Sequence, residues 1–573
     1  MTGGNEMKKR IVAMLLVFAL CISGLVGCGD GNKDNVGESI ANAIKEKHQD
    51  LGAEFDEAYY PVEGQIEQKQ GKIDVVILFE GSQDGWKALA DEYTRLHGGQ
   101  VAVVLNTDYS SGTYQDALRY EITSNGTEWD IVMGNYVSDI VNTYCLNMYS
   151  YINQPNAYAG NNTWSSVLEE DAYITDKTGA NTSTYIMNSE NLWTAWFVNK
   201  VALNEAGKLG YKNANGEVDN PVTWEDLINL CKYMKKAGYE NPMGISLSES
   251  SVKTEHFSWL LRVYGDYYWR NEYDGIMSAG SEFELDPMDE NPESNIEYAV
   301  DVTKLYHKIL DENSKQYVGA NSAKYKEFIS NIQEMKPYLD TINGTQASMT
   351  DLRNEFKTQS SGKASPQIVL DYLGTGLSFL NSKAEGLEVD FFDYPTMLSK
   401  KGYVPEGMLT RDVGGNGGYL SIVNHKAAQN ELNLDFIKFV MSPYGQSIYY
   451  DALSKTEFAP KGLTLVKQDL VKVPSTWIDF FQTEKITFTG LSDSSEFVRN
   501  LLVGCCGEDV QGDLTELWQK YMVGVGNDEI STNVFGENWR DISLSAWTKY
   551  AQKNSWNVNC YKYPGQGTSY GGE

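Results

Sequence analysis

Three short apolar runs, rich in residues that favour strands, lie between residues 73 and 133, and each predicts a buried strand. They are Ile73–Phe79, Val101–Leu105 and Trp129–Met133. Between them, apolar residues recur at helical spacing over Trp86–Leu96 and again over Thr113–Thr123. A strand–helix–strand–helix–strand order predicts a parallel sheet with right-handed crossovers.

The carboxyl ends of two of these strands carry short polar runs. Glu80–Gln83 follows the first strand and Gly134–Tyr136 follows the third. Ligands of open α/β sheets bind beyond the carboxyl ends of the strands. We therefore expect binding residues in these two loops.

A second pattern of the same kind begins at Thr194. The apolar run Ala195–Val198 predicts another buried strand, and Val201–Ala206 turns into a short helix. After a polar loop, Thr223 caps a longer helix, because Asp226 three residues on completes a capping box. Its apolar stripe consists of Trp224, Leu227, Ile228, Cys231 and Met234. These elements predict a second α/β region.

Helical patterns also occur outside these two regions. Residues 313–359 predict additional helical structure, and the long tail predicts helices over Glu508–Val523 and Asn538–Gln552. A chain of 573 residues is too long for one ordinary core, so we expect two lobes or more.

Two blocks of residues resemble a known family. The first is Val198-Asn-Lys200 with Gly207, then Pro221-Val-Thr-Trp-Glu-Asp-Leu227 and Lys235-Lys236. The second is Gly414–Val423, then Leu434–Val440 and Ser442-Pro-Tyr-Gly-Gln-Ser-Ile448, continued by Phe458-Ala-Pro460. Their order and spacing resemble bacterial extracellular solute-binding proteins of family 1. These are the sugar-binding, maltodextrin-binding-protein-like receptors of ABC importers, and the resemblance covers roughly Ile73 to Lys461.

The resemblance implies an α/β fold of the two-lobed, periplasmic-binding-protein-like type (type II). Such a fold has parallel-rich sheets with flanking helices and a ligand cleft at the hinge. We expect hinge crossings near Thr182–Glu190, at Val389–Pro395 and in the strand leading into Ala459-Pro460. The implied order is lobe 1 over 72–185 and 395–457, and lobe 2 over 186–394 and 458–573, the latter including a C-terminal extension.

Binding residues are implied at the strand ends and crossings. Aromatic faces stack on the apolar faces of sugar rings, while carboxylates and amides take the hydroxyls. The candidate set is Glu80, Gln83, Asn135, Tyr136, Glu190, Asn191, Trp193, Tyr268, Trp269, Asp371, Tyr372 and Gly417. Trp193 and Trp269 are the preferred stacking platforms, with core packing as the alternative for each. Asp371-Tyr372-Leu-Gly374 stands where the family usually has Gly-Ser-Trp, so the role of that Trp is not carried over.

The N-terminus has the pattern of an export signal. Lys8-Lys9-Arg10 precedes the apolar run Ile11–Val26, which is shorter than the roughly 20 residues of a membrane span. Leu25-Val26-Gly27-Cys28 resembles a lipobox, so residues 1–27 are expected to be a signal peptide and Cys28 a lipid anchor. Residues 28–71 are expected to form an acidic tether. The expected location is the extracytoplasmic face of the bacterial cell membrane.

Charge and composition narrow the partners. A net charge of −31 argues against nucleic acid and anionic membrane surfaces. Seven scattered cysteines and five histidines form no CxxC or zinc pattern, and the acidic loop Phe283–Glu293 lacks calcium-loop spacing. We expect no metal and no cofactor. The expected partners are a carbohydrate, most simply an oligosaccharide, and the permease of an ABC transporter, with the protein a monomer.

Two alternatives remain open. A cell-surface glycoside hydrolase needs two carboxylates flanking one bond, and no G-x-S-x-G, HExxH or P-loop motif points to other hydrolytic chemistry. Our expectation is therefore a binding protein rather than an enzyme. A peptide or another charged solute would need a buried counter-charge, for which Arg262, Arg353 and Arg411 are the central candidates.

Overall fold

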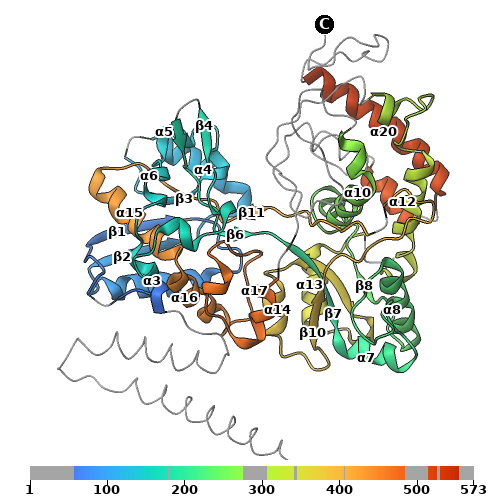
Figure 1. Cartoon of the computed structure of the whole chain (residues 1–573), viewed down its shortest axis with the longest axis horizontal. Coiled ribbons are helices and arrows are strands. Elements are labelled where there is room, and N and C mark those ends of the chain that lie inside the picture. Colours follow the sequence, from blue (N-terminus) through green and yellow to red (C-terminus); the bar gives the residue numbers. More distant parts are fainter. Residues whose placement is uncertain are drawn as a thin grey trace, which may run out of the picture. The chain divides into compact units, whose positions relative to one another are not determined.

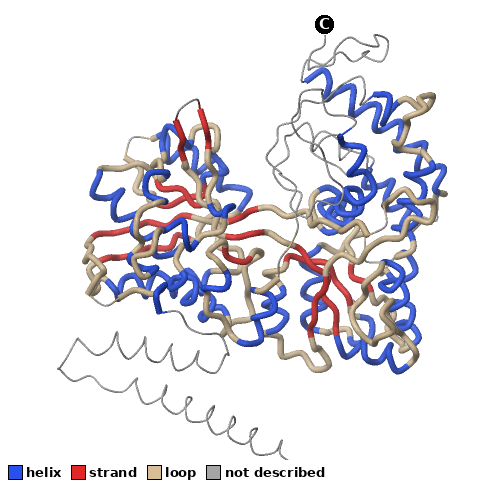
Figure 2. The backbone as a smooth tube through the Cα atoms, in the orientation of Figure 1, coloured by secondary structure: helices blue, strands red, loops and turns tan. Residues whose placement is uncertain are grey.

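The computed structural model describes residues 57–62, 64–124, 126–178, 181–274, 306–340, 345–405, 407–483, 485, 514–524 and 529–553. The expected signal peptide, Cys28, most of the acidic tether and the loop Phe283–Glu293 lie outside these residues. The described chain contains two four-stranded sheets, each with its own helices, and the segments that connect them (Figures 1 and 2).

The first sheet has the strand order β12-β3-β1-β2. Its strands are β1 (Gly71–Val76), β2 (Val101–Asn106), β3 (Ile131–Met133) and β12 (Leu420–Ile422). β1 pairs in parallel with β2 and β3, as predicted, and β12 returns antiparallel to β3. The predicted helices are confirmed as α3 (Gln83–Leu96) and α4 (Ser111–Thr123). Two later helices, α15 (Ala427–Val440) and α16 (Pro443–Leu453), also pack against this half.

The second sheet has the order β10-β7-β9-β8. Its strands are β7 (Thr194–Asn199), β8 (Met243–Gly244), β9 (Ile368–Tyr372) and β10 (Val389–Phe392). β7 is antiparallel to both β9 and β10, and β8 runs parallel to β9. The chain leaves β7 through α7 (Lys200–Lys208) and enters α8 (Trp224–Lys236), where the predicted Thr223–Asp226 capping box is formed.

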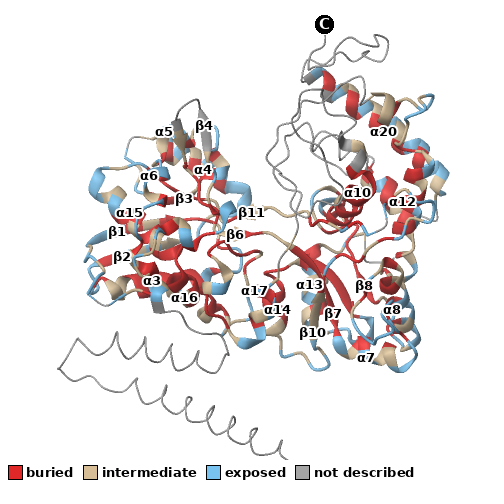
Figure 3. Ribbon diagram, in the orientation of Figure 1, coloured by how far each residue is buried: buried red, intermediate tan, exposed pale blue. Residues whose placement is uncertain are grey.

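Helices from distant parts of the chain share one apolar core beside the second sheet (Figure 3). They include α10 (His256–Asp274), α12 (Ala323–Gln333), α19 (Leu514–Met522) and α20 (Thr532–Lys553). Phe257 of α10 meets Trp518 of α19 edge to face at 4.9 Å between ring centroids. The helices predicted in the tail therefore complete this core, because their apolar faces are buried against the earlier helices.

The remaining short elements lie in the connections. They are α5 (Val141–Tyr144), α6 (Tyr149–Ile152), β4 (Asp176–Thr178), β5 (Asn181–Ser183), α9 (Glu249–Lys253), α13 (Met349–Thr358), α14 (Gly376–Leu380) and α17 (Ile478–Phe481). α13 provides helical structure within the 313–359 segment, as predicted.

Three two-residue strands connect the two halves. β6 (Glu190–Asn191) lies between β11 (Asn416–Gly417) and β13 (Leu463–Thr464), and it pairs antiparallel with both. β6 leads directly into β7 of the second sheet, and β11 leads directly into β12 of the first. We refer to β6, β11 and β13 as the hinge sheet.

The expected crossing at Val389–Pro395 is corrected by this topology. Val389–Phe392 is β10, an edge strand of the second sheet paired with β7. Met397, Val404 and Met408 after it are buried in the core beside that sheet. The chain returns to the first sheet later, through β11, because residues 395–411 still contribute apolar side chains to the second core.

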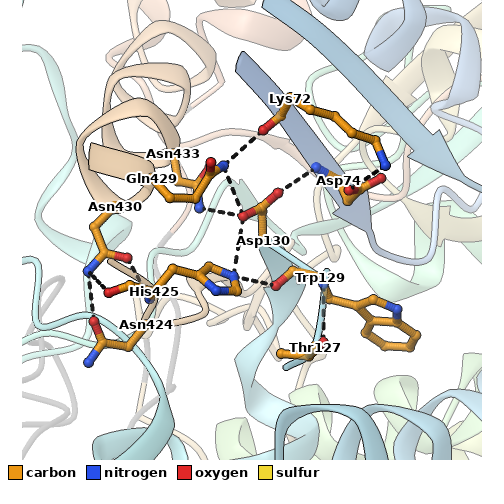
Figure 4. Close-up of polar contacts among 10 residues, drawn as sticks. All are labelled: Lys72, Asp74, Thr127, Trp129, Asp130, Asn424, His425, Gln429, Asn430 and Asn433. Carbon is orange, nitrogen blue, oxygen red and sulfur yellow. Dashed lines mark hydrogen bonds and ion pairs between the residues drawn. The ribbon is translucent and has the colours of Figure 1, made fainter. Parts of the chain in front are cut away.

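A buried polar cluster joins the amino end of β3 to α15 (Figure 4). Asp130, 4% exposed, accepts hydrogen bonds from the backbone N of Asp74 at 2.8 Å and from Asn433 Nδ2 at 2.9 Å. Gln429 Nε2 lies 3.1 Å from the same carboxylate, and His425 Nε2 lies 3.3 Å from it. Burial raises the pKa of Asp130 above its usual range. One carboxylate therefore holds strand and helix together.

Candidate functional site

A pocket of about 260 Å³ lies beyond the carboxyl ends of β1 and β3. One side comes from the first half, through the segment after β1, the start of α3 and the segment after β3. The other sides come from the hinge strands β6 and β11, from Tyr372 at the end of β9, and from Pro460 and Lys461. The pocket is thus built from both sheets and from the strands between them.

An ion pair crosses one side of the pocket. Lys461 Nζ lies 2.8 Å from Glu80 Oε2, and the two side chains are 39% and 46% exposed. The same ammonium lies 5.8 Å from the centre of the Tyr372 ring, within the range of a cation–π contact. Lys461 therefore links the loop after β1 to the last residue of β9, and its charge is balanced by Glu80.

The loop that carries Glu80 has an unusual backbone. Glu80 has φ +30° and the next residue, Gly81, has φ +89°. A Cβ at Gly81 would lie 2.7 Å from the backbone oxygen of Ala459. Glycine is required there because the loop packs against the segment that precedes Lys461.

Five aromatic side chains line the pocket. They are Phe79, Trp86, Tyr136, Tyr372 and Tyr419. Edge-to-face contacts with other rings position Trp86, Tyr136 and Tyr372. The ring centroids lie 6.1 Å apart for Phe79 and Trp86, 5.2 Å for Tyr114 and Tyr136, and 4.6 Å for Trp259 and Tyr372. Burial raises the pKa of Tyr136, Tyr372 and Tyr419, so their phenols are neutral donors at neutral pH. Fixed rings with neutral hydroxyls suit a flat, polar-edged ligand.

Glu190 occupies the centre of the hinge sheet and lines the pocket. Its Oε2 accepts a hydrogen bond from the backbone N of Gly462 at 2.9 Å. Burial, which outweighs that hydrogen bond, raises the pKa of Glu190 to about 7. This carboxyl changes charge near neutral pH, whereas an exposed glutamate is ionised there.

The structure brings together six of the twelve candidate residues. These are Glu80, Asn135, Tyr136, Glu190, Tyr372 and Gly417. Asn191 is buried next to Glu190 in β6, and its Oδ1 accepts no hydrogen bond within the described part of the chain. Gln83 is exposed at the first turn of α3, and Trp193 is half-buried between β6 and β7; neither lines the pocket.

The other three candidates lie in the interior of the second half. Tyr268 and Trp269 are 2% and 0% exposed in the core of α10 and α12, and Trp269 Nε1 donates to the backbone oxygen of Val318 at 3.2 Å. The stacking role given to Trp269 is therefore wrong, because both of its faces are covered by the protein. Asp371, 1% exposed, is held by Arg353 through two hydrogen bonds of 2.7 Å.

The candidate arginines do not supply a charge to the pocket. Arg353 is paired with Asp371, and Arg411 is paired with the buried Asp266. Arg262 lies on α10 and does not line the pocket. A charged solute would therefore have to compete for Lys461 or Glu80.

Sequence reasoning missed several pocket residues. Trp86 was assigned only to the apolar stripe of α3, and Tyr419 was included only as part of the second family-like block, Gly414–Val423. Lys461 ended the family-like region without a role. The signal that was available was position: Lys461 comes directly after the Pro460 of the second block, and Tyr419 comes two residues after Gly417.

In the part of the chain that the structure describes, no helix is long and apolar enough to cross a membrane. Within the same residues, no three or more His, Cys, Asp or Glu side chains come close enough together to hold a metal ion.

Two α/β halves joined by three short strands, with a pocket at that junction, define a periplasmic-binding-protein-like receptor. The model of the family described as bacterial extracellular solute-binding protein matches residues 88–461, which is more than half of the chain. The chain belongs to this family. The resemblance read from the two sequence blocks and the predicted fold class are both confirmed.

Solved structures of low sequence identity are similar to the chain. One is a family 1 extracellular solute-binding protein from Bifidobacterium longum subsp. infantis, with 13% identity, TM-score 0.46, and coverage of 84% of this chain and 99% of that one. Another is a cyclic alpha-maltosyl-1,6-maltose binding protein from Arthrobacter globiformis, with 11% identity, TM-score 0.48, and coverage of 83% and 99%. A third is an ABC-transporter binding protein from Bifidobacterium animalis subsp. lactis in complex with mannobiose, with 14% identity, TM-score 0.47, and coverage of 84% and 97%. No curated protein sequence matches the chain.

Proposed function

We propose that this solute-binding protein captures a neutral carbohydrate in the pocket between its two halves and delivers it to the permease of an ABC importer. The observation that carries the proposal is the composition of the pocket wall. Five aromatic rings stand beside Asn135, Glu190 and the balanced pair of Glu80 and Lys461. Aromatic faces stack on the apolar faces of a sugar ring, and the polar groups pair with its hydroxyls.

The charge balance favours an uncharged solute. Lys461 already has Glu80 as its partner, and Arg353 and Arg411 are paired with carboxylates outside the pocket. A hydroxyl left buried without a partner costs about 1–3 kcal/mol, so a pocket of this kind can distinguish one sugar from another.

The hinge sheet supplies a means of reporting occupancy. Three strands of two residues each bend more easily than the sheets on either side. A solute that touches Glu80 and Tyr372 contacts both halves, and so it stabilises the closed arrangement by a population shift. The lipid anchor expected at Cys28 would hold the receptor beside the permease.

A thermal-shift panel tests the ligand class. Glucose, mannose, maltose, xylobiose and chitobiose are compared with a dipeptide and a tripeptide at equal concentration. A ligand at 100 times its dissociation constant stabilises the folded protein by about 2.7 kcal/mol, which a melting curve resolves. Stabilisation by peptides and by none of the sugars would overturn the proposal.

An enzymatic role has one observation in its favour, since Glu80 and Glu190 are two carboxyls in one pocket. A glycoside hydrolase uses such a pair as acid and base or nucleophile. We nevertheless propose binding without catalysis, because Glu80 is engaged by Lys461 at 2.8 Å. Hydrolysis of aryl glycosides by the wild type, lost in Glu80→Gln, would favour the enzyme instead.

A further inference from the structure

Glu190 is enclosed more completely than the other acidic residue of the pocket. It lies in the central strand of the hinge sheet, between β11 and β13. Besides the main pocket, it lines a smaller cavity of about 20 Å³ together with Trp86, Tyr449 and Tyr450. The carboxyl therefore stands between the solute pocket and the protein interior.

Two glycines leave room for the Glu190 side chain and fix its position. A Cβ at Gly462 would lie 2.6 Å from Glu190 Cβ and 2.8 Å from Glu190 Oε2. A Cβ at Gly418, where φ is +62°, would lie 3.2 Å from Glu190 Cγ and 1.8 Å from Ser189 Oγ. Backbone on both sides thus confines the carboxyl to the pocket wall.

The groups that face Glu190 do not balance a negative charge. Among the described residues, no Lys, Arg or His forms an ion pair with it, and the nearby Lys461 is paired with Glu80 at 2.8 Å. Glu80 itself disfavours a second negative charge. The phenols of Tyr419, Tyr449 and Tyr450 are the other titratable groups near it, and all three are neutral at neutral pH. Burial without a counter-charge favours the protonated form.

The two oxygens of the carboxyl then have different tasks. Oε2 accepts from Gly462 N, so it presents its lone pairs to the backbone. A proton on the other oxygen makes it a hydrogen-bond donor, which a carboxylate can never be. Sugar ring oxygens and hydroxyls are acceptors for such a donor.

We propose that Glu190 determines specificity as a neutral carboxylic acid, donating a hydrogen bond to an oxygen of the bound solute. The inference rests on the proposed function, since it needs a solute oxygen in this pocket. Affinity should be highest below neutral pH and should fall about tenfold for each pH unit above the pKa of Glu190, because the ionised form cannot donate.

The first experiment needs no ligand. Urea unfolding of the full chain is measured between about pH 5 and pH 8 for the wild type, Glu190→Gln and the exposed control Glu217→Gln. A raised carboxyl pKa in the folded state means that folding takes up a proton between the ordinary value of 4.5 and about 7. The stability of the wild type should therefore fall relative to Glu190→Gln as pH rises through this window, while Glu217→Gln follows the wild type. Parallel curves for wild type and Glu190→Gln would overturn the inference.

The second experiment measures calorimetric affinity for whichever of glucose, mannose, maltose, xylobiose and chitobiose stabilises the protein. Between pH 7 and pH 9 the wild type should lose affinity about 50-fold, because a carboxyl with a pKa of about 7 is already half ionised at pH 7. Glu190→Gln, whose amide still donates, should change less than threefold. Glu190→Ala should bind weakly at every pH. Equal pH profiles for wild type and Glu190→Gln would refute the donor role. If no sugar binds at any pH, the proposed function fails, and the unfolding experiment alone then decides whether Glu190 carries the proton.

Discussion

Substituting Asp130 is the most informative test of how the first half is held together, because its carboxylate accepts hydrogen bonds from both a strand and a helix. Replacing it by alanine removes the acceptor shared by Asp74 N and Asn433 Nδ2, at 2.8 and 2.9 Å. Gln429 retains acceptors in the backbone oxygen of Lys72 and in Asn433 Oδ1, so its amide loses least. Two buried donors without partners, at about 1–3 kcal/mol each, predict a loss of about 2–6 kcal/mol of unfolding free energy.

Urea unfolding followed by far-ultraviolet circular dichroism measures this loss as a lower midpoint at an unchanged slope. Asp139→Ala is the matched control, because Asp139 forms an ion pair of similar length, 2.7 Å, with Arg119, but both side chains are largely exposed. Its midpoint should not move measurably. If Asp130→Ala and Asp139→Ala unfold at the same urea concentration as the wild type, the cluster does not hold β3 to α15.

Three further predictions concern other parts of the molecule. Trp269→Ala should lower the free energy of unfolding by about 3–5 kcal/mol, because removing a fully buried indole leaves a cavity. Urea titration measures this loss, and an unchanged midpoint would return Trp269 to the stacking candidates. Tyr372→Ala should weaken binding of the sugar found in the panel about three- to tenfold, because one ring contact is lost. Tyr120→Ala, on the exposed surface of α4, should leave the affinity measured by calorimetry unchanged. Cys28→Ser should release the protein from the membrane fraction or leave it unprocessed on a gel, because the acyl chains would be missing; unchanged partitioning would contradict the lipid anchor.

Local periodicity was sufficient to predict three of the four strands of the first sheet, the two helices between them and the start of the second sheet. Strands β1 to β3 are short apolar runs flanked by helices with clear stripes, and parallel pairing follows from that order. The Thr223–Asp226 capping box was readable because both partners lie within four residues. The hinge strand β11 has no such signal, since it consists of Asn416 and Gly417 within a glycine-rich run.

The site was predictable only where the topology fixes it. Glu80, Asn135 and Tyr136 follow strands whose carboxyl ends meet at one edge, so their convergence needed no tertiary information. Tyr268 and Trp269, which follow Tyr267 directly, were misjudged as site residues for the opposite reason. Three consecutive residues cannot share one face of a helix, yet all three are buried because α10 is covered on several sides by helices from much later in the chain.

The placement of the tail helices has a consequence for the order in which the chain can fold. Trp196 of β7 and Trp547 of α20 belong to the same apolar core, although about 350 residues separate them. At about 5–20 residues per second, a ribosome needs roughly 20 to 70 seconds to complete that interval. The four strands of the first sheet and the helices α3, α4, α15 and α16, by contrast, are all present once α16 has been made. As the chain emerges from its amino end, the first sheet can therefore form while the second half still lacks the helices that cover its core, and it is the second half that a chaperone would have to protect.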